Sequence, residues 1–201
     1  WLSIFLANHD QPRMVSKFGN DTPAYREIAS KMLSTFVFTM RGTPFYFQGD
    51  ELGMTNIRFD SIEDYNDVEA KNQYAKLVEI GGDTQAFIEV KKQTSRENSR
   101  TPFQWNTSEN AGFTSGKPWL KVNPNYVEIN AEMQLNDPKS ILNYFKKLVQ
   151  IRKNEPTLTY GTFEIIDKPN PSVFAFMRTL NERKILVILN FSEKESKINL
   201  S

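Results

Sequence analysis

The residues best suited to chemistry stand together near the start of the sequence, as Asn8-His9-Asp10 directly after the apolar run 1–7. A strand that ends in two ionisable side chains points them toward the edge of a sheet where β/α folds build their sites. There, an imidazole and a carboxylate could hold hydroxyl groups or stabilise a developing positive charge. The spacing alone equally fits a structural turn, in which Asp10 caps the turn and His9 is hydrogen-bonded at the rim.

Two charged residues farther along the chain are further candidates for binding a ligand. Arg100, in the stretch 98–102, carries a planar guanidinium that can bind two oxygens at once, although a loop salt bridge would also explain it. Glu69 follows Asp67-Val68 on a polar helical stretch, where a glutamate is usually solvated. Four aromatic residues could stack on sugar rings, but we expect them to pack in the core: Trp105, Phe113, Trp119 and Tyr126.

The charge balance and the missing cysteines restrict the possible partners. Lys plus Arg number 25 against 24 Asp plus Glu, so the net charge of +1 gives no general attraction for nucleic acid or an anionic membrane. A neutral partner such as a sugar is allowed. With 0 cysteines there is no disulfide framework and no thiolate metal ligand, which suits a reducing cytoplasm. We predict no cofactor and no metal site.

The elements that would position His9 and Asp10 form a strand, helix and strand at the start of the chain. The apolar run 1–7 predicts a strand covered on both faces. Thr22-Pro23 predicts a helix start, and Gly42 its end. Between them, apolar residues recur at helical spacing: Ala29, Leu33, Phe36, Val37 and Met40. The aromatic stretch 43–48 predicts a second strand, so 1–48 is one β/α unit.

The rest of the chain divides into a polar excursion, a helix and a group of strands. Residues from Gly49 to about Asn136 are polar, with helical stretches at 62–80 and 84–92, and so long an excursion is usually functional. Asp137-Pro138 predicts the start of a second helix that stops at Pro156. The stretches 159–167, 172–179 and 183–191 predict an antiparallel meander that begins near Leu158 and is cut short at Ser201.

Three motifs, taken together, resemble the final third of the α-amylase family barrel, in the oligo-1,6-glucosidase, dextran glucosidase and α-glucosidase subfamily. They are FLANHDQPR at 5–13, GTPFYFQGDELGMTN at 42–56 and SRENSRTPFQW at 95–105. The resemblance covers essentially the whole chain. It implies an α/β fold: 1–156 would be the last two β/α units of a TIM barrel with a rim insertion at about 49–137. Residues 157–201 would be part of an antiparallel all-β C-terminal domain.

The resemblance also implies a role for each candidate residue. Asp10 matches the third essential carboxylate of such enzymes, which stabilises the positively charged transition state without acting as nucleophile or proton donor. His9 matches a histidine that hydrogen-bonds the same sugar. Arg100 matches an arginine that closes over the terminal glucose. Glu69 stands where relatives bind the leaving sugar.

The other two carboxylates of the resembled mechanism, the nucleophile and the general acid, have no matching motif in this sequence. A retaining glycosidase needs both, roughly 5 to 5.5 Å apart. The chain opens with Trp1 inside an apolar run, so we expect a fragment that is inactive by itself. The expected parent is a retaining, exo-acting α-glucosidase of short oligosaccharides.

Other functions remain open from the sequence. Trehalose-6-phosphate hydrolases and sucrose isomerases share much of this C-terminal sequence. A non-catalytic relative, such as the heavy subunit of an amino-acid transporter, would be expected to lose His9, Asp10 and Arg100, and all three are present. A stand-alone carbohydrate-binding module is a third possibility. A quarter of a barrel exposes sheet edges and apolar faces, so we also expect self-association.

Overall fold

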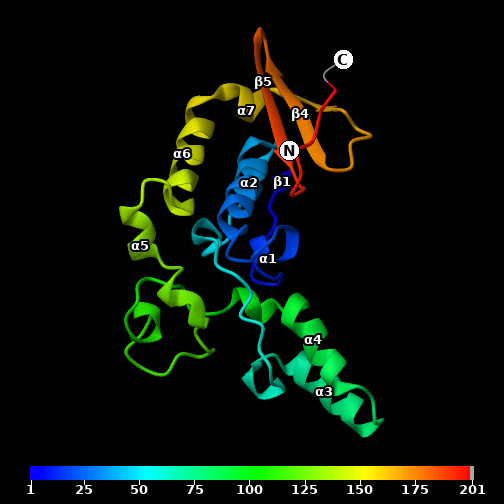
Figure 1. Cartoon of the computed structure of the whole chain (residues 1–201), viewed down its shortest axis with the longest axis vertical. Coiled ribbons are helices and arrows are strands. Elements are labelled where there is room, and N and C mark those ends of the chain that lie inside the picture. The colour runs from blue at the N-terminus through cyan, green and yellow to red at the C-terminus, as the bar shows by residue number, and fades with distance from the viewer. Residues whose placement is uncertain (200–201) are drawn as a thin grey trace.

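The first 48 residues form one parallel β/α unit, as predicted, but its strands are short. A computed structural model describes residues 1–199 and is elongated, with an antiparallel sheet at one end and two helices at the other (Figure 1). Strand β1 (Ser3–Ile4) pairs in parallel with β2 (Thr43–Pro44). Within residues 1–199, β1 and β2 pair only with each other. A two-stranded sheet is marginally stable, which is consistent with strands shorter than predicted.

Two helices connect these strands. Helix α1 (Met14–Phe18) was not predicted, and α2 (Arg26–Thr39) buries Ala29, Leu33 and Val37 as expected. The predicted start at Thr22-Pro23 is wrong, because the hydroxyl of Thr22 donates to Asn20 Oδ1 at 2.7 Å and does not cap the helix. The Thr22 carbonyl instead accepts from the backbone N–H of Tyr25 and Arg26, so a turn at 23–25 leads into the helix, which begins at Arg26.

Glycine is required at the end of this helix-to-strand connection. Gly42 has a φ of 140°, a backbone conformation that residues with a side chain rarely adopt. A Cβ at this position would lie 2.5 Å from the Leu2 carbonyl oxygen. The backbone of β2 can therefore approach β1 only with glycine at this position.

The second predicted helix is present and carries the C-terminal sheet. Helix α6 (Ile141–Asn154) begins three residues after Pro138, because Ser140 is the N-cap and its hydroxyl accepts from Asn143 N at 3.2 Å. Pro156 ends this helix as predicted, but it also occupies the first turn of a short helix, α7 (Pro156–Tyr160).

The predicted meander is confirmed as a three-stranded antiparallel sheet, but it begins at Thr162 and not near Leu158, because residues 156–160 form helix α7. Strands β3 (Thr162–Ile166), β4 (Val173–Leu180) and β5 (Arg183–Asn190) pair in chain order. Phe176, Val187 and Leu189 form its core, against which Phe36 of α2 and Met40, the residue that follows α2, pack. The sheet thus rests on the β/α unit. The predicted interruption at Ser201 lies outside the described residues.

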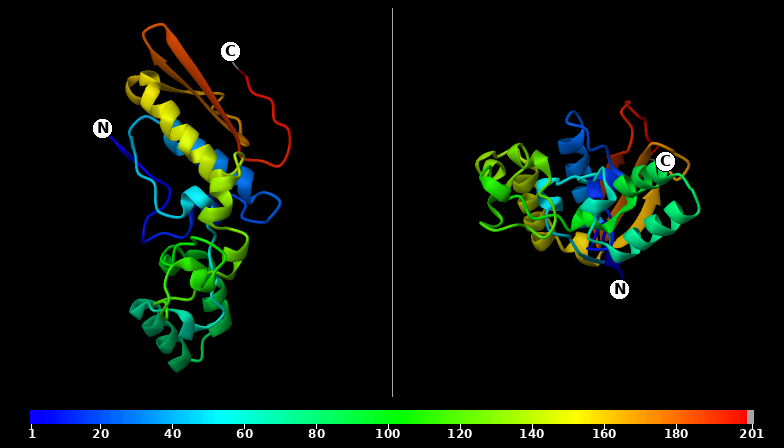
Figure 2. Two further views of the ribbon diagram at one scale, coloured as in Figure 1. Left: turned by 90° about the vertical axis from the view of Figure 1, so that its left-hand side faces the viewer. Right: turned by 90° about the horizontal axis from the view of Figure 1, so that it is seen from below.

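The polar excursion contains short turns and a separate helical lobe. Helices α3 (Val68–Glu79) and α4 (Thr84–Thr94) lie at the opposite end of the molecule from the sheet (Figure 1 and the left view of Figure 2). Four residues form the core at their base: Phe59, Tyr65, Ile88 and Leu120. The remaining elements are 3₁₀ turns and one helix: Asp50–Leu52, Ile62–Asp64, Arg96–Ser99, Glu109–Gly112, Pro124–Val127 and α5 (Ala131–Asn136).

No helix within residues 1–199 has the length and apolar character needed to cross a membrane. Within the same range, no group of three or more His, Cys, Asp or Glu side chains is arranged to hold a metal ion.

Candidate functional site

His9 and Asp10 lie in a turn that follows β1, and their side chains face solvent. The turn is capped by Asn8, whose Oδ1 accepts from Asp10 N at 2.8 Å. Asp10 does not cap the turn itself, so its carboxylate is available for other contacts. The side chains of His9 and Asp10 are 71% and 51% exposed, and His9 Nε2 lies 3.1 Å from Asp10 Oδ2.

Arg100 reaches both residues from a segment 90 positions later. Its Nη2 donates to Asp10 Oδ1 at 2.8 Å, and its Nε donates to the His9 carbonyl at 2.8 Å. One planar guanidinium therefore holds the whole turn. The loop salt bridge considered from the sequence does form, and its partner is the candidate carboxylate Asp10.

The segment that carries Arg100 is fixed by its own turn and by the N-terminal unit. Arg100 follows the 3₁₀ turn Arg96–Ser99, at whose start Ser95 Oγ accepts from Glu97 N at 3.2 Å. The hydroxyl of Ser99 donates to the carbonyl of Gln11, one residue after Asp10. The short turn therefore delivers Arg100 to its partners in a set orientation.

Arg96 is a second arginine at the site, and sequence reasoning did not single it out. Its Nε and Nη2 donate to Asp67 Oδ2 and Oδ1 at 2.9 and 3.1 Å, and its Nη1 lies 3.6 Å from Asp10 Oδ1. Partial burial raises the pKa of Asp67, but hydrogen bonds from Arg96 and from backbone N–H groups outweigh burial and hold it below the usual value. The signal in the sequence was the motif at 95–105, which contains two arginines four residues apart.

Glu69 and Arg100 line the same cavity, which has a volume of about 560 Å³. Glu69 is exposed on the first turn of α3, and its Oε1 accepts from Gln73 Nε2 at 3.0 Å. Asp10 lines a neighbouring cavity of about 450 Å³, and Arg100 connects the two through its contact with Asp10. The first cavity is in the size range of small-ligand sites and is lined by Asn66, Asp67, Val68, Glu69, Asn72, Gln73, Arg96 and Arg100.

The carboxylates after β2 are engaged within the scaffold. Asp50 is buried, and burial raises its pKa to about 7 even though the nearby Arg13 guanidinium lowers it. Glu51 Oε2 accepts from Gly49 N at 2.8 Å. Neither residue lines either of the two cavities.

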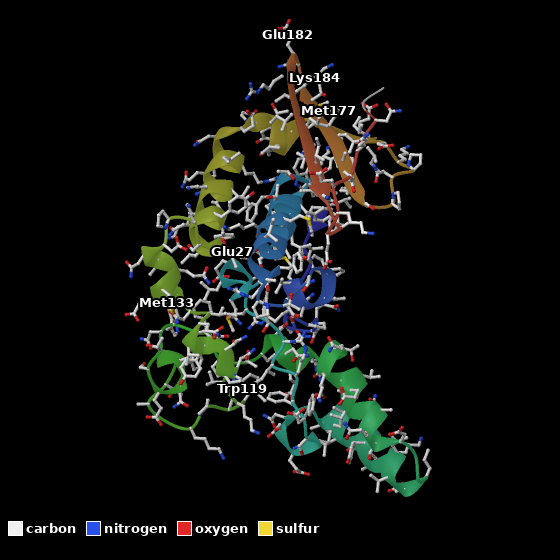
Figure 3. The ribbon with its side chains drawn as sticks, viewed as in Figure 1. Glu27, Trp119, Met133, Met177, Glu182 and Lys184 are labelled. Atoms are coloured by element: carbon white, nitrogen blue, oxygen red, sulfur yellow. The ribbon has the colours of Figure 1, made fainter. Side chains whose placement is uncertain are left out.

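The expectation that the aromatic candidates pack in the core is wrong for three of them. Trp105, Phe113 and Trp119 are 53%, 46% and 56% exposed, and Tyr126 is half-buried. Trp119 lies far from the antiparallel sheet that carries Met177 and Lys184 (Figure 3). None of the four lines the cavity beside Arg100.

Comparison with known proteins gives two family matches that together cover almost the whole chain. Residues 1–161 match the family described as "Alpha amylase, catalytic domain", and residues 163–201 match "Maltogenic Amylase, C-terminal domain". The chain is 51% identical over 195 residues to an oligo-1,6-glucosidase of Parageobacillus thermoglucosidasius, covering 96% of this chain and 34% of that protein. It is 48% identical over 200 residues to a trehalose-6-phosphate hydrolase of Bacillus subtilis, covering 100% and 36%.

Solved structures give the same result for the fold. The isomaltulose synthase SmuA from Protaminobacter rubrum superposes with a TM-score of 0.93 at 51% identity, over 96% of this chain and 35% of that one. This confirms the predicted fold class, part of a TIM barrel followed by an antiparallel sheet. The chain spans about a third of the length of the relatives it matches.

Proposed function

Because this chain belongs to the α-amylase family, whose catalytic-domain pattern covers residues 1–161, we propose that it is the C-terminal part of a retaining α-glucosidase of the oligo-1,6-glucosidase type. The parent enzyme would hydrolyse terminal α-glucosidic bonds of short oligosaccharides. The observation that carries the proposal is the pair of hydrogen bonds by which Arg100 holds the Asp10 side chain and the His9 carbonyl. It places an arginine and a carboxylate at one exposed turn, where a sugar could reach both.

Each site residue has a role that follows from its chemistry. Asp10 would hold hydroxyl groups of the terminal glucose and stabilise the positive charge that develops at its anomeric carbon. His9 would hydrogen-bond the same glucose, and Arg100 would close over it. Glu69, which lines the same cavity as Arg100, would bind the leaving sugar. These contacts can bind and stabilise but cannot form the covalent intermediate, so we expect the 201-residue chain by itself to be inactive.

The test is an assay of the intact parent enzyme on isomaltose, with the anomer of the released glucose followed by NMR. The proposal expects glucose with retained α configuration. Absence of activity on every glucoside tried would overturn the enzyme assignment and favour a non-catalytic relative. Binding of isomaltose by the 201-residue chain alone, at about millimolar affinity in calorimetry, would instead favour a carbohydrate-binding module.

Two alternative activities are supported by the relatives. The Bacillus subtilis trehalose-6-phosphate hydrolase covers 100% of the chain, and a structure of isomaltulose synthase from Erwinia rhapontici NX5 with sucrose is 53% identical. The same assay, repeated with trehalose 6-phosphate and with sucrose as substrates, separates these activities from the proposed one. Faster turnover of trehalose 6-phosphate than of isomaltose would favour the first, and conversion of sucrose to isomaltulose the second.

Three further expectations accompany this proposal. The barrel portion would end at 156 and the sheet domain begin at 157, close to the change of family pattern between 161 and 163. The chain alone would self-associate, since Trp1, Leu2 and Phe45 are exposed along the β1–β2 pair, and light scattering would reveal this. The parent would reside in the cytoplasm, which suits a sequence with 0 cysteines.

A further inference from the structure

Two carboxylate contacts join the segment that carries Glu69 to the segment that carries Arg100. In the first, Arg96 donates two hydrogen bonds to the carboxylate of Asp67, at 2.9 and 3.1 Å. In the second, Asn66 N donates to Glu97 Oε2 at 2.6 Å. Residues 66–67 are thus paired with residues 96–97, and three of these four residues line the cavity: Asn66, Asp67 and Arg96.

Asp67 connects directly to the helix that presents Glu69. Its Oδ1, which accepts from Arg96, also accepts from Glu69 N at 3.0 Å as the N-cap of α3. At the other end, Arg96 Nη1 approaches Asp10 Oδ1 at 3.6 Å. A continuous series of contacts therefore runs from Glu69 through Asp67 and Arg96 to Asp10.

This series has the geometry of a positioning device. Arg96 lines the cavity and its side chain is 38% exposed, whereas that of Asp67 is 10% exposed. Water reaches the pair from the Arg96 side, which limits its contribution to global stability. A two-bond guanidinium–carboxylate contact nevertheless fixes the relative orientation of its two partners. The main consequence of the Asp67–Arg96 pair is therefore geometric: it sets where Glu69 stands relative to Asp10.

We propose that the Asp67–Arg96 pair is a positioning element that determines selectivity for the leaving sugar. The inference rests on the proposed function, in which Asp10 holds the terminal glucose and Glu69 binds the sugar that departs. With the pair intact, both sugars of an oligosaccharide are bound in register with the reacting bond. Without it, α3 shifts relative to Asp10, and only the leaving-sugar contacts are lost.

The test compares two substrates of the intact enzyme in the variant Asp67→Asn. Asparagine keeps the N-cap of α3 but removes the charge that Arg96 binds. We expect kcat/KM for isomaltose to fall about tenfold, mainly through a higher KM, because one charge-assisted contact is lost. For p-nitrophenyl α-glucoside, whose leaving group is not a sugar, the fall should stay below about threefold. Glu79→Gln, on the exposed last turn of α3, is the matched control and should change neither value.

A second variant guards against misfolding. Arg96→Lys keeps the charge but not the planar fork, so the isomaltose value should lie between those of the wild type and Asp67→Asn. Equal losses for both substrates, or no loss for either, would overturn the positioning role and leave the glucosidase proposal intact. A wild-type enzyme inactive on both substrates would instead overturn the proposed function, and the inference with it.

Discussion

The chain uses arginine in two opposite ways in two regions. Around the end of α2, Arg152 and Arg178 are buried and donate to backbone carbonyls. In the lining of the cavity, Arg96 and Arg100 are part-exposed and contact carboxylates. The same side chain thus serves as a structural cation in one place and as a group open to a ligand in the other.

The buried arginines complete the C-terminal end of helix α2. The last carbonyls of a helix lack partners within the helix. Arg152 of α6 donates to the carbonyls of Phe38, Met40 and Gly42 at 2.6, 3.0 and 2.5 Å. Arg178 of β4 donates to the Thr39 carbonyl at 2.6 Å, so both α6 and the sheet are tied to this helix end.

The partners of each arginine explain the difference between the regions. Backbone carbonyls are fixed by the fold, and burial lowers the pKa of Arg178 to about 10, which leaves it charged at neutral pH. The side-chain partner of Arg100, Asp10, is in contact with water. Sugar hydroxyl groups can therefore reach Arg100 and Asp10 and form hydrogen bonds with either. Substitutions in the first region should therefore affect stability, and those in the second should affect activity.

The largest expected effect is loss of activity in Asp10→Asn of the intact enzyme. Removing the negative charge that stabilises the transition state should lower kcat by on the order of 10³-fold. Isomaltose hydrolysis measures the rate, and thermal unfolding checks the fold. The melting temperature should stay within a few degrees of the wild type, because Asp10 is exposed. A large fall in melting temperature would place Asp10 with the scaffold and break the comparison.

Next in size is the loss of stability in Arg178→Met. The substitution leaves the buried carbonyls of Thr39, Leu158 and Gly161 without a donor. We expect it to lower the free energy of unfolding by about 3 kcal/mol, as measured by urea denaturation. Arg183→Met on β5 is the matched control: Arg183 is exposed and contacts Glu155 at 3.1 Å, so its loss should change stability far less. Equal effects from the two variants would remove the distinction between buried and exposed arginines.

The sequence was sufficient for the order of the longer helices and of the strands, but not for the short helices α1, α5 and α7 or for these contacts between distant residues. Periodicity located α2, α6 and the three strands of the sheet, because one buried face dominates each. Capping was less predictable: Thr22 is a residue type that often caps a helix, but here its hydroxyl donates a hydrogen bond to Asn20 Oδ1. At the site, the motifs indicated His9, Asp10 and Arg100, whereas the contact of Arg96 with Asp67 joins residues 29 positions apart that no local pattern connects.

Asp50 is a carboxylate that shares one property with each of the two regions. Asp50 is buried like Arg178, yet its nearest cation is Arg13, whose Nε and Nη2 have no hydrogen-bond partner within residues 1–199. Burial raises the pKa of Asp50 to about 7 from 3.8, although Arg13 and the Met14 backbone N–H lower it. Asp50 thus resembles the site residues in having an arginine near enough to lower its pKa, although no ion pair joins the two. It resembles the buried arginines in that burial makes its charged form costly.

The smallest expected effect is a change in pH dependence in Asp50→Asn. The folded state holds the Asp50 proton more tightly than the unfolded chain, so stability is highest below about pH 4 for this group and falls as the pH rises toward 7. The slope contributed by one such group is at most about 1.4 kcal/mol per pH unit. Asparagine cannot ionise, so urea unfolding of the variant between pH 5 and pH 7 should lack this slope. Asp60→Asn, which alters an exposed carboxylate whose pKa is lowered by Lys92, should retain it. Glu51 and Glu97, whose pKa values burial also raises, contribute equally in both proteins, so the readout is the difference between the two slopes. Equal slopes in the wild type and Asp50→Asn would mean that Asp50 is already ionised in the folded state at pH 5, and the comparison with Asp10 would then hold despite its burial.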